Sequence, residues 1–208
     1  MGEVTFNGLQ LVTSPGRVMT PRPSTEQLIA AAQAHIGDGA ARVVDVGTGS
    51  GAVAIAIATA CPHAEVWASD TSADAVALAR ANVRHHRLGD RVSVLHGELL
   101  APVDGRFDVI AANLPYVPAS AAAHHPELEA EPFDAVFAAG DGLEAYRRLV
   151  NSATTRLTDG GVLLLQLNRR LVAARRNELP ALAAVLAASR SAQVPAAAVV
   201  EAIAGKAA

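Results

Sequence analysis

A chain of 208 residues has room for one α/β domain of ordinary size, whereas two full domains would be cramped. Hydrophobic residues make up 51% of the chain and aromatic residues only 3%, so the core must be built from Ala, Val, Leu and Ile, which favours helices packed on a sheet. The net charge of -3 and a pI near 6.1 argue against a protein that coats nucleic acid or anionic membranes by bulk electrostatics.

The single cysteine, Cys61, excludes an internal disulfide and suits a reducing compartment. The N-terminus MGEVTFNGLQ lacks the charged region and the apolar region of a signal peptide. No apolar run approaches the roughly 20 residues that a membrane span needs. We therefore expect a soluble, cytoplasmic protein.

Residues 1–40 are expected to form a β-hairpin-like segment and a helix that pack on the core. Short β-like pieces are broken at Asn7-Gly8, a dipeptide typical of tight turns. The stretch from Ser24 to Gln27 has the pattern of a capping box, with Ser24 at the N-cap and a glutamine three residues later. This pattern predicts a helix that runs to Ile36.

Strands and helices then alternate over residues 41–168. The predicted strands are apolar runs, namely ARVVDVG, EVWASD, RVSVLHG, FDVIAAN and GVLLLQL. The segments AVAIAIATA, SADAVALARANVRHHRL and 142–157 are helical in pattern. Because the strands are continuously apolar rather than alternating, they indicate a parallel sheet covered on both faces. The sequence therefore predicts an α/β fold with a doubly wound, mostly parallel sheet in three layers.

Two further segments are less regular. Residues 117–141 form a long loop, and loops of this length in compact domains are usually functional or disordered, so the loop is a candidate substrate-recognition lid. Residues 169–208 are rich in alanine and are expected to be a helical C-terminal segment. The histidine pairs at 85–86 and 124–125 are adjacent rather than spaced along one helix face, so no metal site is expected.

The first strand of this core ends in a glycine turn, Asp45-Val46-Gly47-Thr48-Gly49-Ser50-Gly51. Such glycines let the backbone come close to a ligand, while a tight turn without a ligand is the alternative. A dinucleotide site has the spacing G-x-G-x-x-G, whereas this turn reads G-x-G-x-G with Asp45 two residues before it. A carboxylate there would crowd a pyrophosphate but suits the ammonium and sulfonium charges of S-adenosylmethionine.

The ends of the next two strands carry further acidic residues. Asp70 ends the second strand, where a carboxylate can accept both hydroxyls of a ribose, although it could instead cap the following helix. Glu98 follows the third strand, where it could accept a hydrogen bond from an adenine amino group. The expected cofactor-binding residues are Asp45, Gly47, Thr48, Gly49, Gly51, Asp70, Glu98 and Asn113.

The fourth strand ends at Asn113-Leu114-Pro115-Tyr116, next to the same cleft. On its own this stretch could be a proline turn. However, the Asn113 side-chain carbonyl and the Leu114 backbone carbonyl could each accept one N–H of a planar NH₂ group, while the Tyr116 ring packs on the flat face of the substrate. Pro115 would fix the backbone. Catalysis would then be positioning for an in-line methyl transfer, with no strong general base.

Several stretches together resemble one family. DVGTGSGAVAIAIA, Asp70 and NLPY look like a class I S-adenosylmethionine-dependent methyltransferase of the kind that methylates planar amino nitrogens. The stretch VMTPRPSTEQL is similar to the P-R-P-E-T-E segment of the HemK/PrmC family, protein-(glutamine-N5) methyltransferases that act on peptide chain release factors. EPFDAVFAAGDGLEAYRRL and GGVLLLQL are similar to further passages of that family, and the resemblance covers residues 5–168.

The resemblance implies a Rossmann-like fold with residues 41–168 as the S-adenosylmethionine-binding core. It implies that Asn113, Pro115 and Tyr116 are the catalytic residues that carry a substrate glutamine, and that Asp45 lies by the methionine part of the cofactor. Arg22, in Pro21-Arg22-Pro23, would wall the cleft and join the substrate-binding residues Asn113, Leu114, Pro115 and Tyr116. The chain departs from the family at Leu114, which replaces the usual first proline, and at Ser24 and Gln166, where the family has Glu.

These features predict an N-methyltransferase that acts on the side-chain amide of a protein glutamine, with a peptide chain release factor as its partner. The family's separate N-terminal helical domain has no recognisable counterpart in these 208 residues. Two alternatives therefore stay open: methylation of a nucleic-acid adenine or a small-molecule amine, and a cofactor-binding but inactive partner subunit. The low net basicity counts against nucleic acid. The sequence leaves the oligomeric state open.

Overall fold

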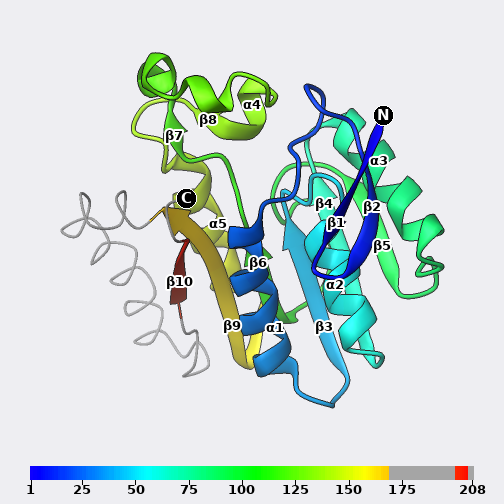
Figure 1. The fold of residues 1–208 in the computed structure, drawn as a ribbon. Coiled ribbons are helices and arrows are strands. Elements are labelled where there is room, and N and C mark those ends of the chain that lie inside the picture. The colour runs from blue at the N-terminus through cyan, green and yellow to red at the C-terminus, as the bar shows by residue number, and fades with distance from the viewer. Residues whose placement is uncertain (169–199, 206–208) are drawn as a thin grey trace.

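The computed structural model describes residues 1–168 and 200–205 (Figure 1). The chain opens with an antiparallel hairpin of β1 (Gly2–Phe6) and β2 (Leu9–Thr13). Asn7 and Gly8 form the turn between them, and both have positive φ angles, which a two-residue turn of type I′ requires. The hairpin lies over one side of the sheet, beside the helices that cover it (Figure 1).

The first helix begins later than the sequence predicts. Pro23 opens a short 3₁₀ helix, η1 (Pro23–Thr25), and α1 (Glu26–Ile36) follows with Thr25 as its N-cap. The predicted capping box is therefore wrong, because the 3₁₀ turn displaces Ser24 from the cap position. Its hydroxyl instead accepts a hydrogen bond from the distant side chain of Gln166 at 3.2 Å.

The centre of the fold is a parallel sheet with six strands among the described residues, and this confirms the predicted doubly wound α/β fold. The strand order is β10-β9-β6-β3-β4-β5, so the chain proceeds outward from β3 on one side and then returns to the other side with β6. The strands are β3 (Ala41–Val46), β4 (Ala64–Asp70), β5 (Val92–His96), β6 (Phe107–Ala112), β9 (Leu157–Asn168) and β10 (Val200–Gly205). The connecting helices are α2 (Ala52–Ala60), α3 (Ala73–His85) and α5 (Glu144–Ala153).

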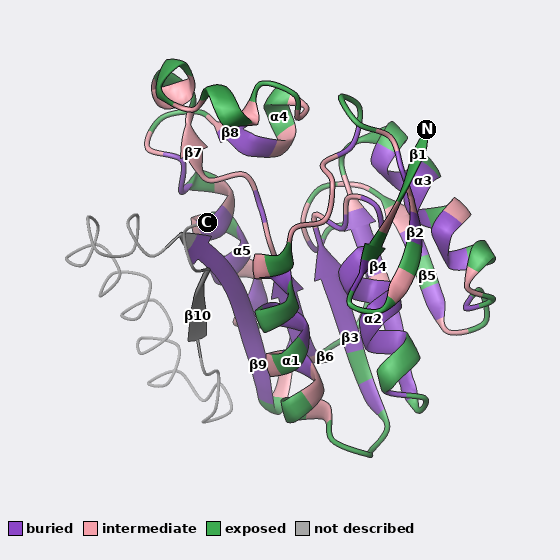
Figure 2. Ribbon diagram, viewed as in Figure 1, coloured by how far each residue is buried: buried purple, intermediate pink, exposed green. Residues whose placement is uncertain are grey.

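Both faces of the sheet are covered, which explains why its strands are continuously apolar (Figure 2). Val43 of β3 and Leu164 of β9 point to the face covered by α1, α2 and α3. The neighbouring residues Val44 and Leu163 point to the opposite face, covered by α5. The alternation places one hydrophobic cluster on each side of the sheet and yields the predicted three layers.

The prediction of a helical segment at residues 169–208 is wrong for residues 200–205, the part of it that the structure describes. Residues 200–205 form β10, which pairs in parallel with β9 from Val200↔Leu163 to Gly205↔Asn168. The outer edge of β9 would otherwise present unpaired backbone groups there. Residues 169–199 and 206–208 lie outside the described residues.

The long segment after β6 is not structureless, although the sequence indicates only a loop. It contains a short parallel pair, β7 (Val117–Pro118) with β8 (Phe137–Ala138). Between these strands lie η2 (Ala119–His124), η3 (Pro126–Leu128) and α4 (Phe133–Val136). The segment projects beyond the carboxyl edge of the sheet (Figure 1, upper left).

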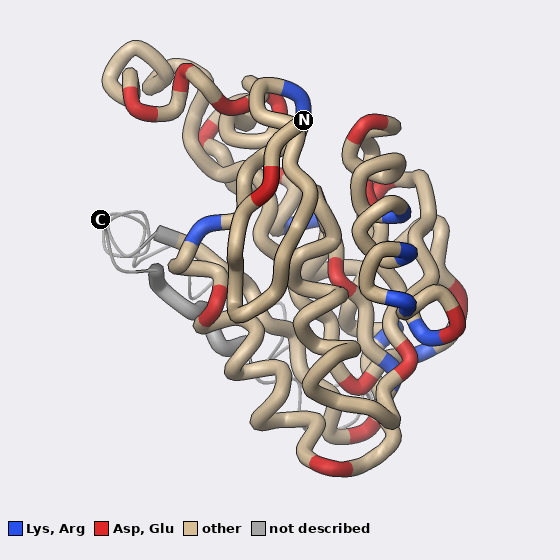
Figure 3. The backbone as a smooth tube through the Cα atoms, turned by 45° about the vertical axis from the view of Figure 1, so that its right-hand side comes forward, with Lys and Arg blue, Asp and Glu red and all other residues tan. Residues whose placement is uncertain are grey.

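Acidic and basic positions are interspersed along the described chain (Figure 3). Several charged pairs join separate elements, such as Arg17 with Asp74 at 2.7 Å. None of the helices in the described part of the chain is both long enough and apolar enough to span a bilayer.

Asn82 of α3 fastens the hairpin to the core. Its side chain is fully buried, and Oδ1 accepts the N–H of Val12 at 2.9 Å. Its Nδ2 donates to the carbonyl of Val12 at 3.0 Å and to the carbonyl of Ser50 at 2.9 Å. One amide therefore satisfies backbone groups of both β2 and the glycine turn.

Replacing Asn82 with Ala should lower the free energy of unfolding by about 3 kcal/mol, because three backbone groups lose their buried partner. Urea denaturation followed by circular dichroism measures this loss. Arg84→Ala, an exposed change on the same helix, should stay within about 0.5 kcal/mol of the wild type. Equal stabilities for the two variants would contradict this role of Asn82.

Candidate active site

The glycine turn after β3 brings the backbone to the carboxyl edge of the sheet. Gly47, Gly49 and Gly51 have φ angles of +72°, +57° and +83°, which glycine adopts without strain. The N–H of Gly47 donates to the carbonyl of Ser69 at 2.8 Å and ties the turn to β4. A Cβ on Gly47 would lie 2.6 Å from Cδ2 of Leu114 and 3.9 Å from the carbonyl oxygen of Asn113, so the turn lies directly against the stretch after β6.

Asp70 ends β4, and its carboxylate holds the glycine turn. Oδ2 accepts the N–H of Gly49 at 2.8 Å, and Oδ1 accepts the N–H of Ser72 at 2.9 Å. Ser72 is the N-cap of α3, so the alternative in which Asp70 caps that helix is wrong. Each carboxylate oxygen retains lone pairs, so it can still accept a ligand hydroxyl.

Asp45 lies beneath the turn rather than in front of it, since it is only 2% exposed. Its Oδ2 accepts the hydroxyl of Thr48 at 2.5 Å and the N–H of Ala54 at 3.3 Å. Burial raises the pKa of the Asp45 carboxyl to about 6, against the opposite effect of the Thr48 hydrogen bond. The hydrogen bond between Thr48 and Asp45 therefore stabilises the glycine turn on its buried side.

Asn113 follows β6 directly, and the register of β3 with β6 sets its place. Val46 pairs with Ala112, so Gly47 and Asn113 are the first residues beyond the two strands. The Asn113 Nδ2 donates to Oγ1 of Thr25 at 3.3 Å. Within the described part of the chain, its Oδ1 accepts no hydrogen bond. This carbonyl oxygen is therefore available beside the glycine turn.

Tyr146 of α5 holds the backbone next to Asn113, and the sequence analysis missed it. Its hydroxyl is fully buried, accepts the N–H of Leu114 at 3.0 Å and lies 3.0 Å from the Leu114 carbonyl. It also donates to the carbonyl of Gln166 at 2.7 Å. Burial raises the pKa of this hydroxyl, so it stays protonated. The apolar spacing of Tyr146, Leu149 and Val150 along α5 is the signal that indicates its inward position.

Gln166 is a second site residue to which sequence reasoning gave no role. It lies on β9, where Ala112 pairs with Leu165, so Gln166 and Asn113 stand next to each other across the two strands. Its side chain is 5% exposed, and its Nε2 donates to Oγ of Ser24 at 3.2 Å.

Asn113 and Gln166 line a cleft. The walls come from the segment before α1, the stretch after β6, the end of β9 and the long loop. The structure thus brings together the predicted substrate-side residues and adds Ser24 and Gln166 to them. The residues concerned are Arg22, Ser24, Asn113, Leu114, Pro115, Tyr116 and Gln166. Burial raises the pKa of the Tyr116 hydroxyl.

Arg22 joins the cleft to the long loop. Its guanidinium lies 3.5 Å from the carboxylate of Glu131, and the other oxygen of Glu131 accepts the N–H of Thr20 at 3.2 Å. The loop that was expected to be a lid is therefore anchored to the Pro-Arg-Pro segment by a carboxylate.

Glu98 is paired with a residue outside the predicted cofactor-binding set. Both of its oxygens accept from Arg148 of α5, at 2.5 and 2.8 Å. The Arg148 guanidinium lowers the pKa of Glu98. The predicted contact of Glu98 with an adenine amino group stays a prediction.

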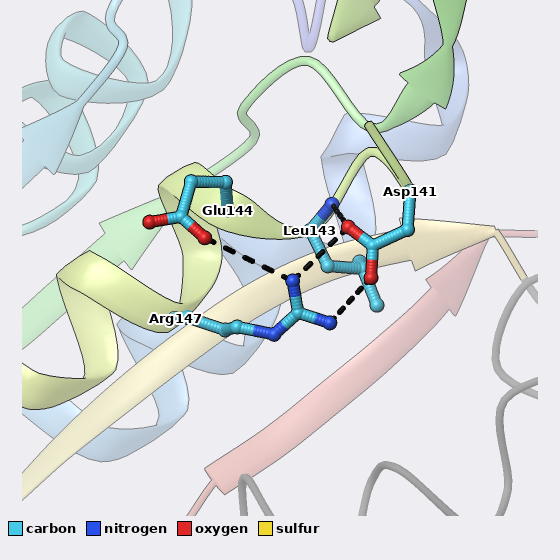
Figure 4. A network of polar contacts seen from close by, with 4 residues as sticks. All are labelled: Asp141, Leu143, Glu144 and Arg147. Atoms are coloured by element: carbon cyan, nitrogen blue, oxygen red, sulfur yellow. Dashed lines mark hydrogen bonds and ion pairs between the residues drawn. The ribbon is translucent and has the colours of Figure 1, made fainter. Parts of the chain in front are cut away.

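The segment before α5 is held by a polar network (Figure 4). Asp141 accepts the N–H of Leu143 at 3.0 Å and pairs through both oxygens with Arg147, which also lies 3.9 Å from Glu144. A Cβ on Gly142, between these residues, would overlap the carbonyl oxygen of Tyr116. The network therefore fixes the backbone at Gly142, which lies directly against the carbonyl of Tyr116 in the substrate-side stretch.

The sheet order and the glycine turn at its switch point define a Rossmann-like methyltransferase fold. The family model described as "Methyltransferase small domain" matches residues 22–130. The chain belongs to this methyltransferase small domain family.

Curated relatives carry a more specific name. A release factor glutamine methyltransferase of Deinococcus radiodurans is 42% identical over 171 residues, which are 81% of this chain and 60% of that protein. A release factor glutamine methyltransferase of Moorella thermoacetica is 36% identical over 190 residues, covering 85% of this chain and 67% of that protein. The chain spans only 60% and 59% of the length of the Deinococcus radiodurans and Gloeobacter violaceus relatives.

Solved structures share the fold. A ribosomal protein L11 methylase of Lactobacillus delbrueckii has a TM-score of 0.57 at 23% identity, covering 82% of this chain and 70% of that one. A 16S rRNA methyltransferase of Thermus thermophilus, in complex with AdoMet and guanosine, has a TM-score of 0.58 at 22% identity, covering 79% and 40%.

The buried carboxyl of Asp45 should make stability depend on pH. Its pKa is about 6 in the folded chain against 3.8 as the ordinary value, so the folded state binds more protons between these pH values and loses stability as the pH rises. Above the folded pKa the loss amounts to about 3 kcal/mol. Asp45→Asn should therefore gain stability relative to the wild type as the pH rises.

Urea denaturation at about pH 4 and about pH 7 measures the difference between Asp45→Asn and the wild type. The exposed substitution Asp90→Asn is the matched control. A difference between Asp45→Asn and the wild type that does not change with pH would contradict the prediction.

Proposed function

We propose that this chain is an S-adenosylmethionine-dependent N-methyltransferase that methylates the side-chain amide of a protein glutamine. One observation carries the proposal: Asn113 follows β6 at the switch point of the sheet, beside Gly47, with its Oδ1 free of hydrogen bonds from the described residues. The names of the curated relatives support glutamine as the acceptor and a peptide chain release factor as the partner.

The residues around the glycine turn fit S-adenosylmethionine. Next to Gly49 a Cβ would meet only Cγ1 of Val18, at 4.0 Å, so a ligand can approach this backbone closely. Asp70 stands at the end of β4, where its remaining lone pairs suit ribose hydroxyls. Asp45, beneath the turn, supplies a negative potential toward the ammonium end of the cofactor. The bound cofactor would supply a methyl group on a positively charged sulfur.

The substrate-side residues act by positioning. An amide nitrogen is a poor nucleophile because its lone pair is delocalised, so the chain must hold the NH₂ group in one plane and aim its density at the methyl group. Asn113 Oδ1 accepts one N–H of this group, and an oxygen beside it accepts the other, for which Leu114 is the expected residue. Tyr116 packs on the flat amide, and Pro115 fixes the backbone between them.

The proton balance requires no resident base. The acceptor nitrogen gains a methyl group and gives up one proton, which is acidic once the nitrogen is methylated and leaves to water. A strong base in the cleft is therefore unnecessary, in agreement with a lining of neutral amides, hydroxyls and apolar groups together with Arg22, whose guanidinium pairs with Glu131.

Asn113→Ala should lower kcat/KM for methyl transfer to an unmethylated release factor by about a hundredfold, because the acceptor amide loses its orienting partner. The Kd for S-adenosylmethionine, measured by isothermal titration calorimetry, should change much less than kcat/KM. Asn151→Ala, an exposed change of the same kind on α5, serves as the control and should leave both values unchanged.

Radiolabelled methyl transfer measures the rate, with parallel incubations that contain release factor or bulk RNA. Transfer to RNA alone would identify the nucleic-acid alternative instead. Cofactor binding without any transfer would support the inactive partner subunit, and the absence of cofactor binding would overturn the proposal at its base.

A further inference from the structure

The hydroxyl of Tyr146 contacts both backbone groups of Leu114. The Leu114 N–H donates to the hydroxyl oxygen at 3.0 Å, and the Leu114 carbonyl oxygen lies 3.0 Å from the same atom. The N–H and the C=O of one residue belong to successive peptide planes, so a partner that contacts both restricts the rotation of the backbone between them. Tyr146 therefore fixes the direction of the carbonyl that is expected to accept the second N–H of the substrate amide.

The Tyr146 hydroxyl is itself held by a third group. The side chain is fully buried, and its single hydrogen can reach two carbonyl oxygens, that of Gln166 at 2.7 Å and that of Leu114 at 3.0 Å. The shorter distance is the usual one for an O–H···O bond, so the hydrogen is donated chiefly to Gln166. The Leu114 peptide is then held through its N–H, while its carbonyl keeps lone pairs for a ligand.

The helix that carries Tyr146 is fixed against the stretch after β6. The polar network of Asp141 and Arg147 holds the start of α5 (Figure 4). Within this network, a Cβ on Gly142 would lie 2.2 Å from the carbonyl oxygen of Tyr116. The contact of Tyr146 is a second point at which α5 meets the same stretch. The hydroxyl therefore comes from a rigid element, which holds a neighbouring group more accurately than a loop does.

The residue type at position 114 decides whether this hydrogen bond can form. Leucine has the backbone N–H that donates to Tyr146, whereas proline has none and fixes its own φ angle with its ring. The chain carries leucine where the family that it resembles carries proline. A hydrogen bond from a buried tyrosine therefore replaces, in this chain, the restraint that a proline ring would supply at the same position.

We propose that Tyr146 is the positioning residue for the amide acceptor at Leu114, holding the peptide so that the carbonyl faces the nitrogen to be methylated. This assignment rests on the proposed function. The hydroxyl is fully buried, so it acts through Leu114 and not on the substrate. Its loss should slow methyl transfer, because a small rotation of the acceptor misaligns the nitrogen with the methyl group. Cofactor binding should change much less.

Tyr146→Phe tests the assignment, since phenylalanine keeps the buried ring and removes only the hydroxyl. We expect kcat for an unmethylated release factor to fall about tenfold, counted per molecule that binds S-adenosylmethionine in isothermal titration calorimetry. A purely structural role would instead lower the number of cofactor-binding molecules and leave kcat per such molecule unchanged. Ser152→Ala removes a different hydroxyl from α5 and should match the wild type.

Leu114→Pro tests whether the hydroxyl acts through the Leu114 peptide. Proline keeps the carbonyl, removes the N–H and restrains the backbone with its own ring. The prediction concerns the ratio of kcat with and without the tyrosine hydroxyl. In the Leu114→Pro background, adding Tyr146→Phe should lower kcat by less than about threefold. The same tenfold loss in both backgrounds would overturn the assignment, because the hydroxyl would then act by another route.

Hydrogen exchange on the wild type tests the contact even where Tyr146→Phe does not fold. The Leu114 amide should exchange at least about tenfold more slowly than in an unstructured chain, and exchange at the unstructured rate would overturn the assignment. A wild type that methylates the release factor while Tyr146→Phe has the same kcat would overturn the assignment alone. A wild type that transfers no methyl group to the release factor would remove the proposed function, and the assignment with it.

Discussion

The parallel pairing of β3 with β6 is the constraint on which the rest of the site depends. In this pair Val46 stands opposite Ala112, so the backbone of the glycine turn and the side chain of Asn113 leave the sheet at the same level. The chain reaches β6 only after it has completed the other side of the sheet, which makes this pair the switch point of the fold. The next pair, β6 with β9, extends the same level to Gln166. The ends of β6 and β9 therefore meet at the cleft, and the glycine turn after β3 lies beside Asn113.

Residues with an apparent ligand role also hold this geometry together. Asp70 bonds the backbone of Gly49, and Asp45 bonds Thr48 from below, so the turn keeps its shape through the protein's own contacts. Preorganisation of this kind lowers the ordering cost of binding. Its cost appears at Asp45, where burial raises the pKa of a carboxyl to about 6, and at Gln166, where a buried acceptor lacks a donor from the described residues. Both unfavourable features, the buried carboxyl of Asp45 and the unpaired acceptor of Gln166, thus lie at the candidate site.

The fold, and the positions of the glycine turn and of residues 113–116 at one edge of the sheet, could be predicted from the sequence because they depend on local patterns. Continuous apolar strands, the glycine turn and the residues around Asn113 are each visible within a few positions. The pair of Ser24 with Gln166 joins residues 142 positions apart, and Tyr146 meets Leu114 across 32 positions, so no local pattern predicts either contact. The capping box failed for a local reason, because Pro23 opens a 3₁₀ turn that displaces Ser24 from the cap position. The partner of Glu98 was likewise unpredictable, because it lies on α5, 50 residues away.

In the proposed function the cleft accepts a planar carboxamide, and the nitrogen of that carboxamide receives the methyl group. Tandem mass spectrometry tests this most directly, after the protein is incubated with an unmethylated release factor and S-adenosylmethionine that carries a deuterated methyl group. We expect one labelled methyl group, located on the side-chain nitrogen of a glutamine. A label found on another type of residue would contradict it.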